Sequence, residues 1–273
     1  MGLLVVKLTL APTFVVGASL ASRRFGPQIG GLIAGLPVVA GPILLVYALA
    51  HGRAFASGAA SGTLLGLVSL TAFLVVYSRV AARAAWSVSL LAGWATFALG
   101  TLVFSAFSIP VGWALALAGA GVLAGLALLP HPTESDSSPG PPPRWDLPLR
   151  AICAAALVLT LAAISGWLGS KISGLLAPFP IIATVLATFT HAQRGVDDVR
   201  RMSRGMVTGF CAFALFCFTA SLALHRLDTA GAFALATVVA LAVQAVMLGL
   251  VRARSARAQA LSASAASPNR ATN

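Results

Sequence analysis

Two short stretches of the chain combine glycine and proline inside apolar sequence. They read QIGGLIAGLPVVAGPI, residues 28–43, and KISGLLAPFPIIATVL, residues 171–186. Each proline removes an amide donor and leaves carbonyl groups of the preceding helical turn without a partner. In lipid, a carbonyl freed in this way has to face protein, water or a ligand. The two stretches are therefore the first candidates for a binding site.

The candidate binding residues are the glycines and prolines of the two stretches, their polar first residues and the threonines that follow. They are Gln28, Gly31, Gly35, Pro37, Pro42, Lys171, Gly174, Pro178, Pro180, Thr184 and Thr188. Glycine and proline are also common in membrane helices, where small residues allow close helix packing. Ligand binding and dry packing both stay open for these stretches, whereas the run Gly58, Gly62 and Gly66 favours packing.

The titratable residues point away from catalysis. All six carboxylates lie in loops or at predicted helix ends, which argues against a proton carrier that uses an acid within the membrane. The sequence shows no ligand set for a metal and no catalytic triad, so we expect neither an enzyme, nor a metal, nor a cofactor. A charged loop holds Arg194, Asp197, Asp198 and Arg201, and mutual salt bridges explain it more simply than a lipid headgroup site.

Composition determines where these residues must lie. The chain has 273 residues, of which 59% are hydrophobic and 9% charged, and its mean hydropathy is +0.94. A soluble core cannot hide so much apolar surface, so the protein belongs in a bilayer. The net charge of +12 does not indicate a nucleic-acid partner, because the basic residues lie between apolar runs. Membrane lipids are the expected surroundings.

Apolar runs long enough to cross about 30 Å of hydrocarbon predict an all-α, polytopic protein with nine transmembrane helices. The predicted spans are Leu3 to Ala21, Ile29 to Ala50, Ser57 to Tyr77, Ala84 to Phe107, Val111 to Leu129, Ala151 to Leu168, Ile172 to Thr190, Gly205 to Leu224 and Ala230 to Val251.

The basic residues fall unequally on the two sides of these spans. One side has Lys7, Arg53, Lys171 and Arg226. The other has Arg23, Arg24, Arg79, Arg83, Arg144, Arg150, Arg194, Arg200, Arg201, Arg204, Arg252, Arg254, Arg257 and Arg270. Because cytoplasmic loops carry the excess of Lys and Arg, this bias predicts an outside N-terminus and a cytoplasmic C-terminus.

The two Gly/Pro stretches align without a gap at a spacing of 143 residues. Ile29, Gly31 and Pro37 match Ile172, Gly174 and Pro180, and the register continues through Gly52 with Gly195, Gly62 with Gly205 and Gly66 with Gly209. Five spans precede the second copy, so an internal duplication would place the two copies in opposite orientations. The sequence therefore predicts an inverted repeat.

The predicted division has four parts. They are a first repeat of five helices in 1–129, a Pro-rich cytoplasmic linker in 130–149, a second repeat of four helices in 150–251, and a basic tail in 252–273 that is disordered beyond about Gln259.

The stretch GSKISGLLAPFPIIATVLATFTHAQRGVDDVRR, residues 169–201, resembles the signature region of the GlpM-like inner-membrane proteins. The shared features are a charged first segment, a GL-x-x-x-FP element and an arginine-glycine loop after the next helix. The resemblance is best over residues 151–251, so the chain looks like a doubled form with an added helix and a linker. It implies a bacterial inner-membrane location and the helix plan, but no catalytic residues.

These observations favour a transporter or flippase-like carrier of a small or lipid-linked anionic substrate. Lys171 and the pair Arg23 and Arg24 stand near the starts of the two Gly/Pro helices, where helix dipoles favour anions. Inverted-repeat carriers work by rocking one repeat against the other. The alternative is a non-catalytic scaffold or accessory subunit of an envelope-building complex, which needs no water-filled cavity. Neither the substrate nor the oligomeric state follows from the sequence.

Overall fold

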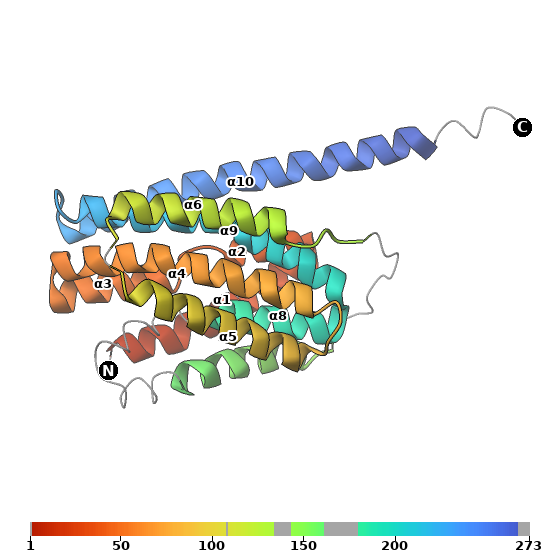
Figure 1. Ribbon diagram of the computed structural model, residues 1–273, viewed down its shortest axis with the longest axis horizontal. Coiled ribbons are helices and arrows are strands. Elements are labelled where there is room, and N and C mark those ends of the chain that lie inside the picture. Colours follow the sequence, from red (N-terminus) through yellow and green to blue (C-terminus); the bar gives the residue numbers. More distant parts are fainter. Residues whose placement is uncertain (1, 108, 134–142, 161–179, 267–273) are drawn as a thin grey trace, which may run out of the picture.

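The computed structural model describes residues 2–107, 109–133, 143–160 and 180–266, and every regular element within these ranges is a helix (Figure 1). The helices are α1 (Gly2–Phe25), α2 (Pro27–Ala34), α3 (Ala40–His51), α4 (Arg53–Val80), α5 (Trp86–Ser105), α6 (Val111–Leu128), α8 (Ile181–Arg194), α9 (Val196–Ala223) and α10 (Thr229–Ala266). Residues 146–160 are also helical.

Five helices, α4, α5, α6, α9 and the first part of α10, are long and apolar enough to cross a membrane. The outer helices α5 and α6 leave large apolar side chains uncovered, with Leu99 64% exposed and Trp113 70% exposed. Water-soluble proteins seldom expose apolar patches of this kind. The fold is therefore that of an α-helical membrane protein.

Helices α4 and α9 form the centre of the bundle and run antiparallel to each other (Figure 1). Near the start of α4, Ser57 Oγ lies 3.0 Å from Ser221 Oγ near the end of α9. At the other end of the pair, Ser78 Oγ donates to Ser203 Oγ at 3.0 Å. These buried hydroxyl pairs satisfy polar groups that would otherwise face an apolar interior.

The remaining helices surround this pair. Helix α5 packs on α4 and α10 packs on α9, while α6 contacts both central helices. Helix α2 lies along α9, and α1 lies along α2. In Figure 1, α10 continues past the end of the bundle.

The helix bounds repeat at the spacing of 143 residues that the sequence shows. Helix α4 covers 53–80 and α9 covers 196–223, α3 and α8 end at residues 51 and 194, and α5 and α10 begin at 86 and 229. The residues before α4 and α9, Gly52 and Gly195, have φ angles of 87° and 86°. Side chains are strained at such angles, so glycine is required at both turns.

The structure differs from the sequence expectations at several places, one of which is the expected charged loop before Gly205, whose residues from Val196 on form the first turns of α9. The span expected over Ile29 to Ala50 consists of two helices, α2 and α3, separated by residues 35–39. The tail expected to be disordered beyond Gln259 is helical to Ala266. Ala, Arg and Gln favour helix, and no Gly or Pro interrupts residues 250–266.

The predicted linker 130–149 also ends earlier than expected, because residues 146–149 already form the first turn of the next helix. The sixth and seventh predicted spans fall partly in residues 161–179, outside the described ranges. Nine spans and the inverted relation of the halves therefore stay predictions.

Candidate functional site

The break between α2 and α3 frees one backbone carbonyl, and a side chain of α10 pairs with it. Beyond the C-cap Gly35, the Leu36 N–H donates to the Ile33 carbonyl, so the Leu32 carbonyl lacks its usual helical donor. Gln244 Nε2 donates to the Leu32 carbonyl at 2.7 Å, and Gln244 is only 9% exposed. The freed carbonyl of the first copy is therefore paired with a protein side chain, which is one of the three partners, protein, water or ligand, that such a group can have in lipid.

The glycines of the first copy lie in a close helix contact. A Cβ added at Gly31 would collide with the Met202 carbonyl oxygen of α9, and one at Gly35 would stand 2.6 Å from that of Met206. In return, Gly205 and Gly209 of α9 face the backbone of α2. Small residues on both helices thus let the two backbones approach. Dry packing accounts for Gly31 and Gly35 in this structure.

The other candidates of the first copy lie around the same break. Pro37 is buried between α2 and α3, Pro42 is half-buried in the first turn of α3, and Gln28 is half-buried in the first turn of α2. The backbone carbonyl of Gln28 takes part in the close contact with Gly205. A role for these residues in ligand binding stays a prediction.

In the second copy, Lys171, Gly174 and Pro178 lie outside the described residues. Pro180 is buried and precedes the first residue of α8. Thr184 and Thr188 lie one turn apart on α8, and Thr184 Oγ1 accepts the Trp94 Nε1–H at 3.0 Å. Further along this helix, His191 has its Nδ1 3.4 Å from the Tyr77 hydroxyl. Helix α8 therefore presents polar groups toward α4 and α5.

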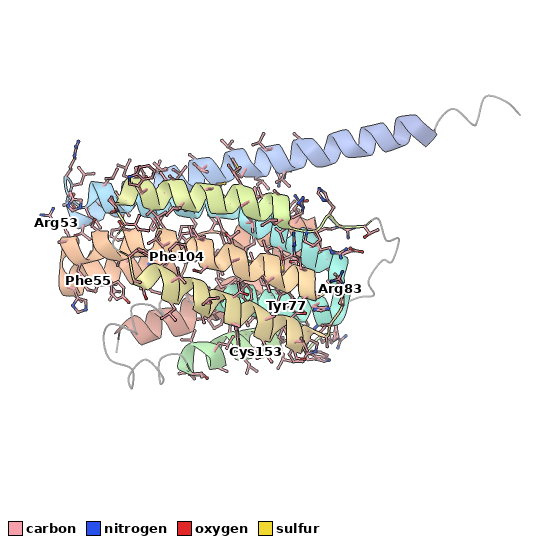
Figure 2. All side chains as sticks on the ribbon, viewed as in Figure 1. Arg53, Phe55, Tyr77, Arg83, Phe104 and Cys153 are labelled. Atoms are coloured by element: carbon pink, nitrogen blue, oxygen red, sulfur yellow. The ribbon has the colours of Figure 1, made fainter. Side chains whose placement is uncertain are left out.

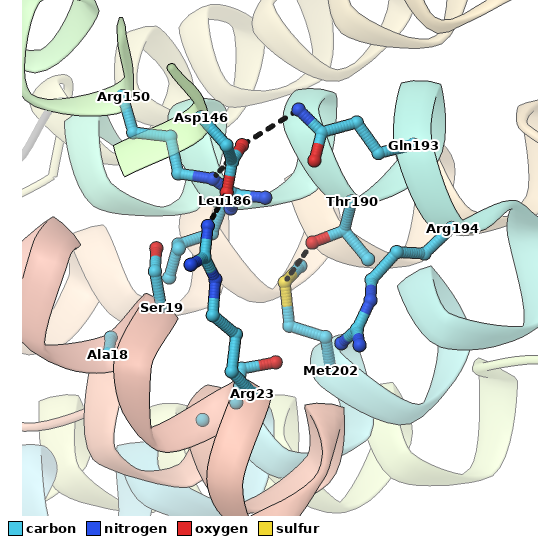
Figure 3. A pocket seen from close by; sticks show the side chains of 12 residues that line it. Ala18, Ser19, Arg23, Asp146, Arg150, Leu186, Thr190, Gln193, Arg194 and Met202 are labelled. Carbon is cyan, nitrogen blue, oxygen red and sulfur yellow. Dashed lines mark hydrogen bonds and ion pairs between the residues drawn. The ribbon is translucent and has the colours of Figure 1, made fainter. Parts of the chain in front are cut away.

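The last turn of α8 leads into a buried charge cluster, which we call the Asp146 cluster: Arg23, Asp146, Arg150, Gln193 and Arg194 (Figure 3). Asp146 is 1% exposed. Its Oδ2 accepts from Arg23 at 2.6 Å, and its Oδ1 accepts from Arg150 Nε at 2.8 Å and from Gln193 Nε2 at 2.7 Å. Three segments, α1, α8 and residues 146–160, meet at this one carboxylate.

A small cavity of about 20 Å³ adjoins the cluster. Ser19 and Ser22 of α1, Gly30 of α2 and Thr190 of α8 contribute to its wall. This volume is enough for about one water molecule. The polar wall and the adjoining guanidinium groups make it suitable for an oxygen-rich, negatively charged group once more room is opened.

The charges in the wall of this cavity are unbalanced. The guanidinium groups of Arg23, Arg150 and Arg194 carry three positive charges, and Asp146 carries the one negative charge of the lining. Burial would raise the pKa of Asp146, but hydrogen bonds from Arg150, Arg23 and Gln193 and the charge of Arg150 lower it below its ordinary value. Asp146 therefore stays ionised at neutral pH, and the lining keeps an excess of positive charge, part of which Asp198 offsets from outside the lining through its ion pair with Arg194.

The charged loop of the sequence analysis forms the start of α9 beside this cluster. Asp198 pairs with Arg201 at 3.0 Å and with Arg194 at 3.7 Å, and Asp197 pairs with Arg200 at 2.9 Å. The ion pairs expected within this loop are present. Only Arg194 of this group also lines the cavity.

Further contacts link arginines at the same end of the bundle. Arg201 Nη2 donates to the Thr133 carbonyl, Arg204 Nη1 to the Leu126 carbonyl and Arg79 to the Leu128 carbonyl. Figure 2 shows Arg83 at this end and Arg53 at the opposite end of the bundle. The described structure thus separates these arginines between its two ends in the way that the positive-inside pattern predicts.

Sequence reasoning missed the burial of Asp146 and the polar partner Gln244. Asp146 follows a run of prolines, which indicated a solvated linker. The available signal was the spacing of Asp146 and Arg150, which puts opposite charges one helical turn apart. For Gln244, the signal was an uncharged polar residue in the middle of an apolar helix.

Among the described residues, no group of three His, Cys, Asp or Glu side chains could hold a metal ion. No protein-family model, no curated protein and no solved structure matches this chain. The resemblance to the GlpM-like proteins therefore stays a prediction.

Proposed function

We propose that this protein is a carrier of a small or lipid-linked anionic substrate in the bacterial inner membrane, and that the Asp146 cluster binds the substrate's negative group. The observation that carries this proposal is the excess of guanidinium groups, one buried and two partly buried, around a small polar cavity. Burying unbalanced charge is unfavourable unless the site serves a purpose or has a partner. An anion from the cytoplasmic side would supply that partner.

The proposed architecture is an inverted repeat with an outside N-terminus and a cytoplasmic C-terminus. The repeated helix bounds support it, and so does the antiparallel packing of α4 and α9, helices that the 143-residue spacing relates. In carriers of this kind, one repeat rocks against the other around a site at their interface. The lining of the cavity supports this proposal, because α1 and α2 contribute residues from the first half and α8, α9 and residues 146–160 contribute the others.

The test is uptake by liposomes that contain the purified protein. The probes are radiolabelled inorganic phosphate, glycerol 3-phosphate and citrate, and chloride at equal ionic strength is the competitor control. We expect saturable uptake of at least one oxyanion, and its loss in Arg150→Gln and Arg23→Gln. Arg53→Gln removes an arginine at the opposite end and should retain uptake. Absence of uptake for every probe, in liposomes with and without anionic lipids, contradicts a carrier of small anions.

The second candidate is a membrane scaffold, which the close contact between α2 and α9 favours because it leaves Gly31 and Gly35 no room for a ligand. Cysteine accessibility distinguishes the two. In a variant without Cys153, Cys211 and Cys217, the carrier predicts that Thr190→Cys reacts with a water-soluble thiol reagent and that a transported anion protects it. The scaffold predicts no reaction at this buried position.

A further inference from the structure

The Asp146 carboxylate is held as a bound anion would be held. It accepts three hydrogen bonds from Arg23, Arg150 and Gln193, at distances of 2.6 to 2.8 Å. Such charge-assisted contacts are the short, strong ones that proteins use for carboxylate and phosphate ligands. The donors of the proposed anion site are therefore already occupied, and the occupant belongs to the chain itself.

The cavity is too small for a substrate while Asp146 stays in place. Its 20 Å³ admits about one water molecule. Withdrawal of the Asp146 side chain would add the volume of a carboxylate group to the cavity. It would also leave the guanidinium groups of Arg23, Arg150 and Arg194 facing the enlarged space. The vacated space has the size of a carboxylate group, and its charge suits a carboxylate or phosphate group.

The position of Asp146 in the chain makes such a withdrawal local. Asp146 is the first residue of the helical range 146–160, and its backbone N–H donates to the Pro143 carbonyl in a turn. A helix of this length can lose its first residue and keep the later turns, since helix ends fray readily. Arg150 lies one turn further on and packs its guanidinium over the Phe189 ring at 5.0 Å. That contact does not involve Asp146.

We propose that Asp146 is a tethered competitor for the substrate: its carboxylate closes the anion site, and a carboxylate or phosphate group of the substrate displaces it from Arg23 and Arg150. This inference rests on the proposed function and adds the chemistry of the recognised group. The exchange of one anion for another leaves the arginines paired throughout.

The experiment compares wild type with Asp146→Ala, which opens a carboxylate-sized space. Formate and inorganic phosphate are added to the detergent-solubilised full chain, with chloride at equal ionic strength. Removing the competitor should lower the half-saturating concentration of formate by at least about tenfold, because apparent affinity scales with the fraction of molecules whose site is open. Formate should also raise the melting temperature of Asp146→Ala, which we expect to be lower than that of wild type. Asp228→Ala removes an exposed carboxylate next to Leu227, whose carbonyl accepts from Arg53 at the opposite end of the bundle, and should show neither effect.

The outcomes separate this inference from the proposed function. Wild-type uptake of an oxyanion together with an unchanged formate response in Asp146→Ala overturns the competitor and leaves the carrier. A similar formate response in Asp228→Ala also overturns it, since the effect is then not specific to the site. If Asp146→Ala folds poorly, Asp146→Asn keeps the side-chain shape without the charge, and weaker phosphate binding than in wild type overturns the inference. Absence of uptake and of any anion response in every variant overturns both proposals.

Discussion

Helices α3 and α8 occupy corresponding places at the 143-residue spacing, yet their side chains differ in kind. Helix α3 is apolar through most of its length, whereas α8 has threonine, histidine, glutamine and arginine at many of the matching positions. Thr184, His191 and Gln193 correspond to Gly41, Ala48 and Ala50. The backbone plan recurs at this spacing, but polar chemistry is concentrated in one helix.

The two copies therefore use the same arrangement of helices for different purposes. The first copy packs tightly: Gly31 and Gly35 meet the backbone of α9, and a single side chain, Gln244, pairs with the freed carbonyl of Leu32. In the second copy, polar residues lie along α8 from Thr184 to Gln193, which belongs to the Asp146 cluster. We infer that the contact of α2 with α9 supplies rigidity, and that α8 supplies most of the polar groups on the second half's side of the site, opposite Arg23 of α1.

The largest effect should come from breaking the packing in the first copy. Gly31→Val places side-chain atoms against the Met202 carbonyl group, and the backbone cannot yield without separating α2 from α9. We expect a loss of about 3 kcal/mol or more of stability, because overpacking against backbone is poorly relieved. The measurement is the melting temperature of the purified protein in detergent.

The control is Gly58→Ala, because an added Cβ there meets no atom within 4 Å. It should leave the melting temperature nearly unchanged. If Gly31→Val is as stable as Gly58→Ala, the first copy is not a rigid element, and the comparison with the second copy no longer holds.

The sequence predicts the backbone plan better than the site, and the reasons are physical. Apolar length locates α4, α6 and the apolar part of α9, but not the charged first turns of α9 from Val196. The prolines and glycines of residues 28–43 indicate the break between α2 and α3. Both are local signals. The burial of Asp146 instead depends on Arg23, which lies 123 residues earlier in the chain, and no local pattern reports such a partner. The sequence did not predict the helical tail, because a segment rich in Arg, Ala and Ser is also typical of disordered chain.

A smaller effect should follow from removing the polar group that pairs with the break. Gln244→Leu leaves the Leu32 carbonyl without the donor it now has. A buried carbonyl left unpaired costs about 1–3 kcal/mol. We expect the lower part of this range, because Gln244 Oε1 is buried and has no hydrogen-bond partner among the described residues, so its loss is favourable.

The check is the same melting measurement, with Gln244→Glu as a second variant. That variant retains the shape and replaces the amide with a carboxyl group, which burial keeps uncharged and able to donate to the Leu32 carbonyl, so it should be more stable than Gln244→Leu. A wild-type melting temperature in both variants would mean that the break needs no partner from α10.

A still smaller loss of stability is expected from a substitution in the second copy, and it tests whether α8 lines the substrate path. Thr184→Val keeps the side-chain shape and removes the hydroxyl that accepts the Trp94 Nε1–H. We expect a loss of about 1 kcal/mol, the net value of an ordinary hydrogen bond. If α8 lines the substrate path, uptake should fall more than this change in stability explains. Equal uptake in Thr184→Val and wild type would confine the site to the Asp146 cluster.

The smallest effect concerns pH and tests the polar side of this comparison, because Asp146, the most deeply buried acid in the described part of the chain, accepts a hydrogen bond from Gln193 of α8. The folded-state pKa of Asp146 lies below its ordinary value. Its contribution to stability is therefore complete above the ordinary carboxylate pKa of about 3.9, and is lost as the pH falls through the lower, folded-state value. Melting temperatures of wild type should decline more steeply below about pH 4 than those of Asp146→Asn.

Parallel declines of the two melting temperatures would show that other carboxylates dominate acid unfolding. They would also show that the three hydrogen bonds to Asp146 do not hold its charge more tightly than water does, and the carboxylate would then be a poor stand-in for a bound anion.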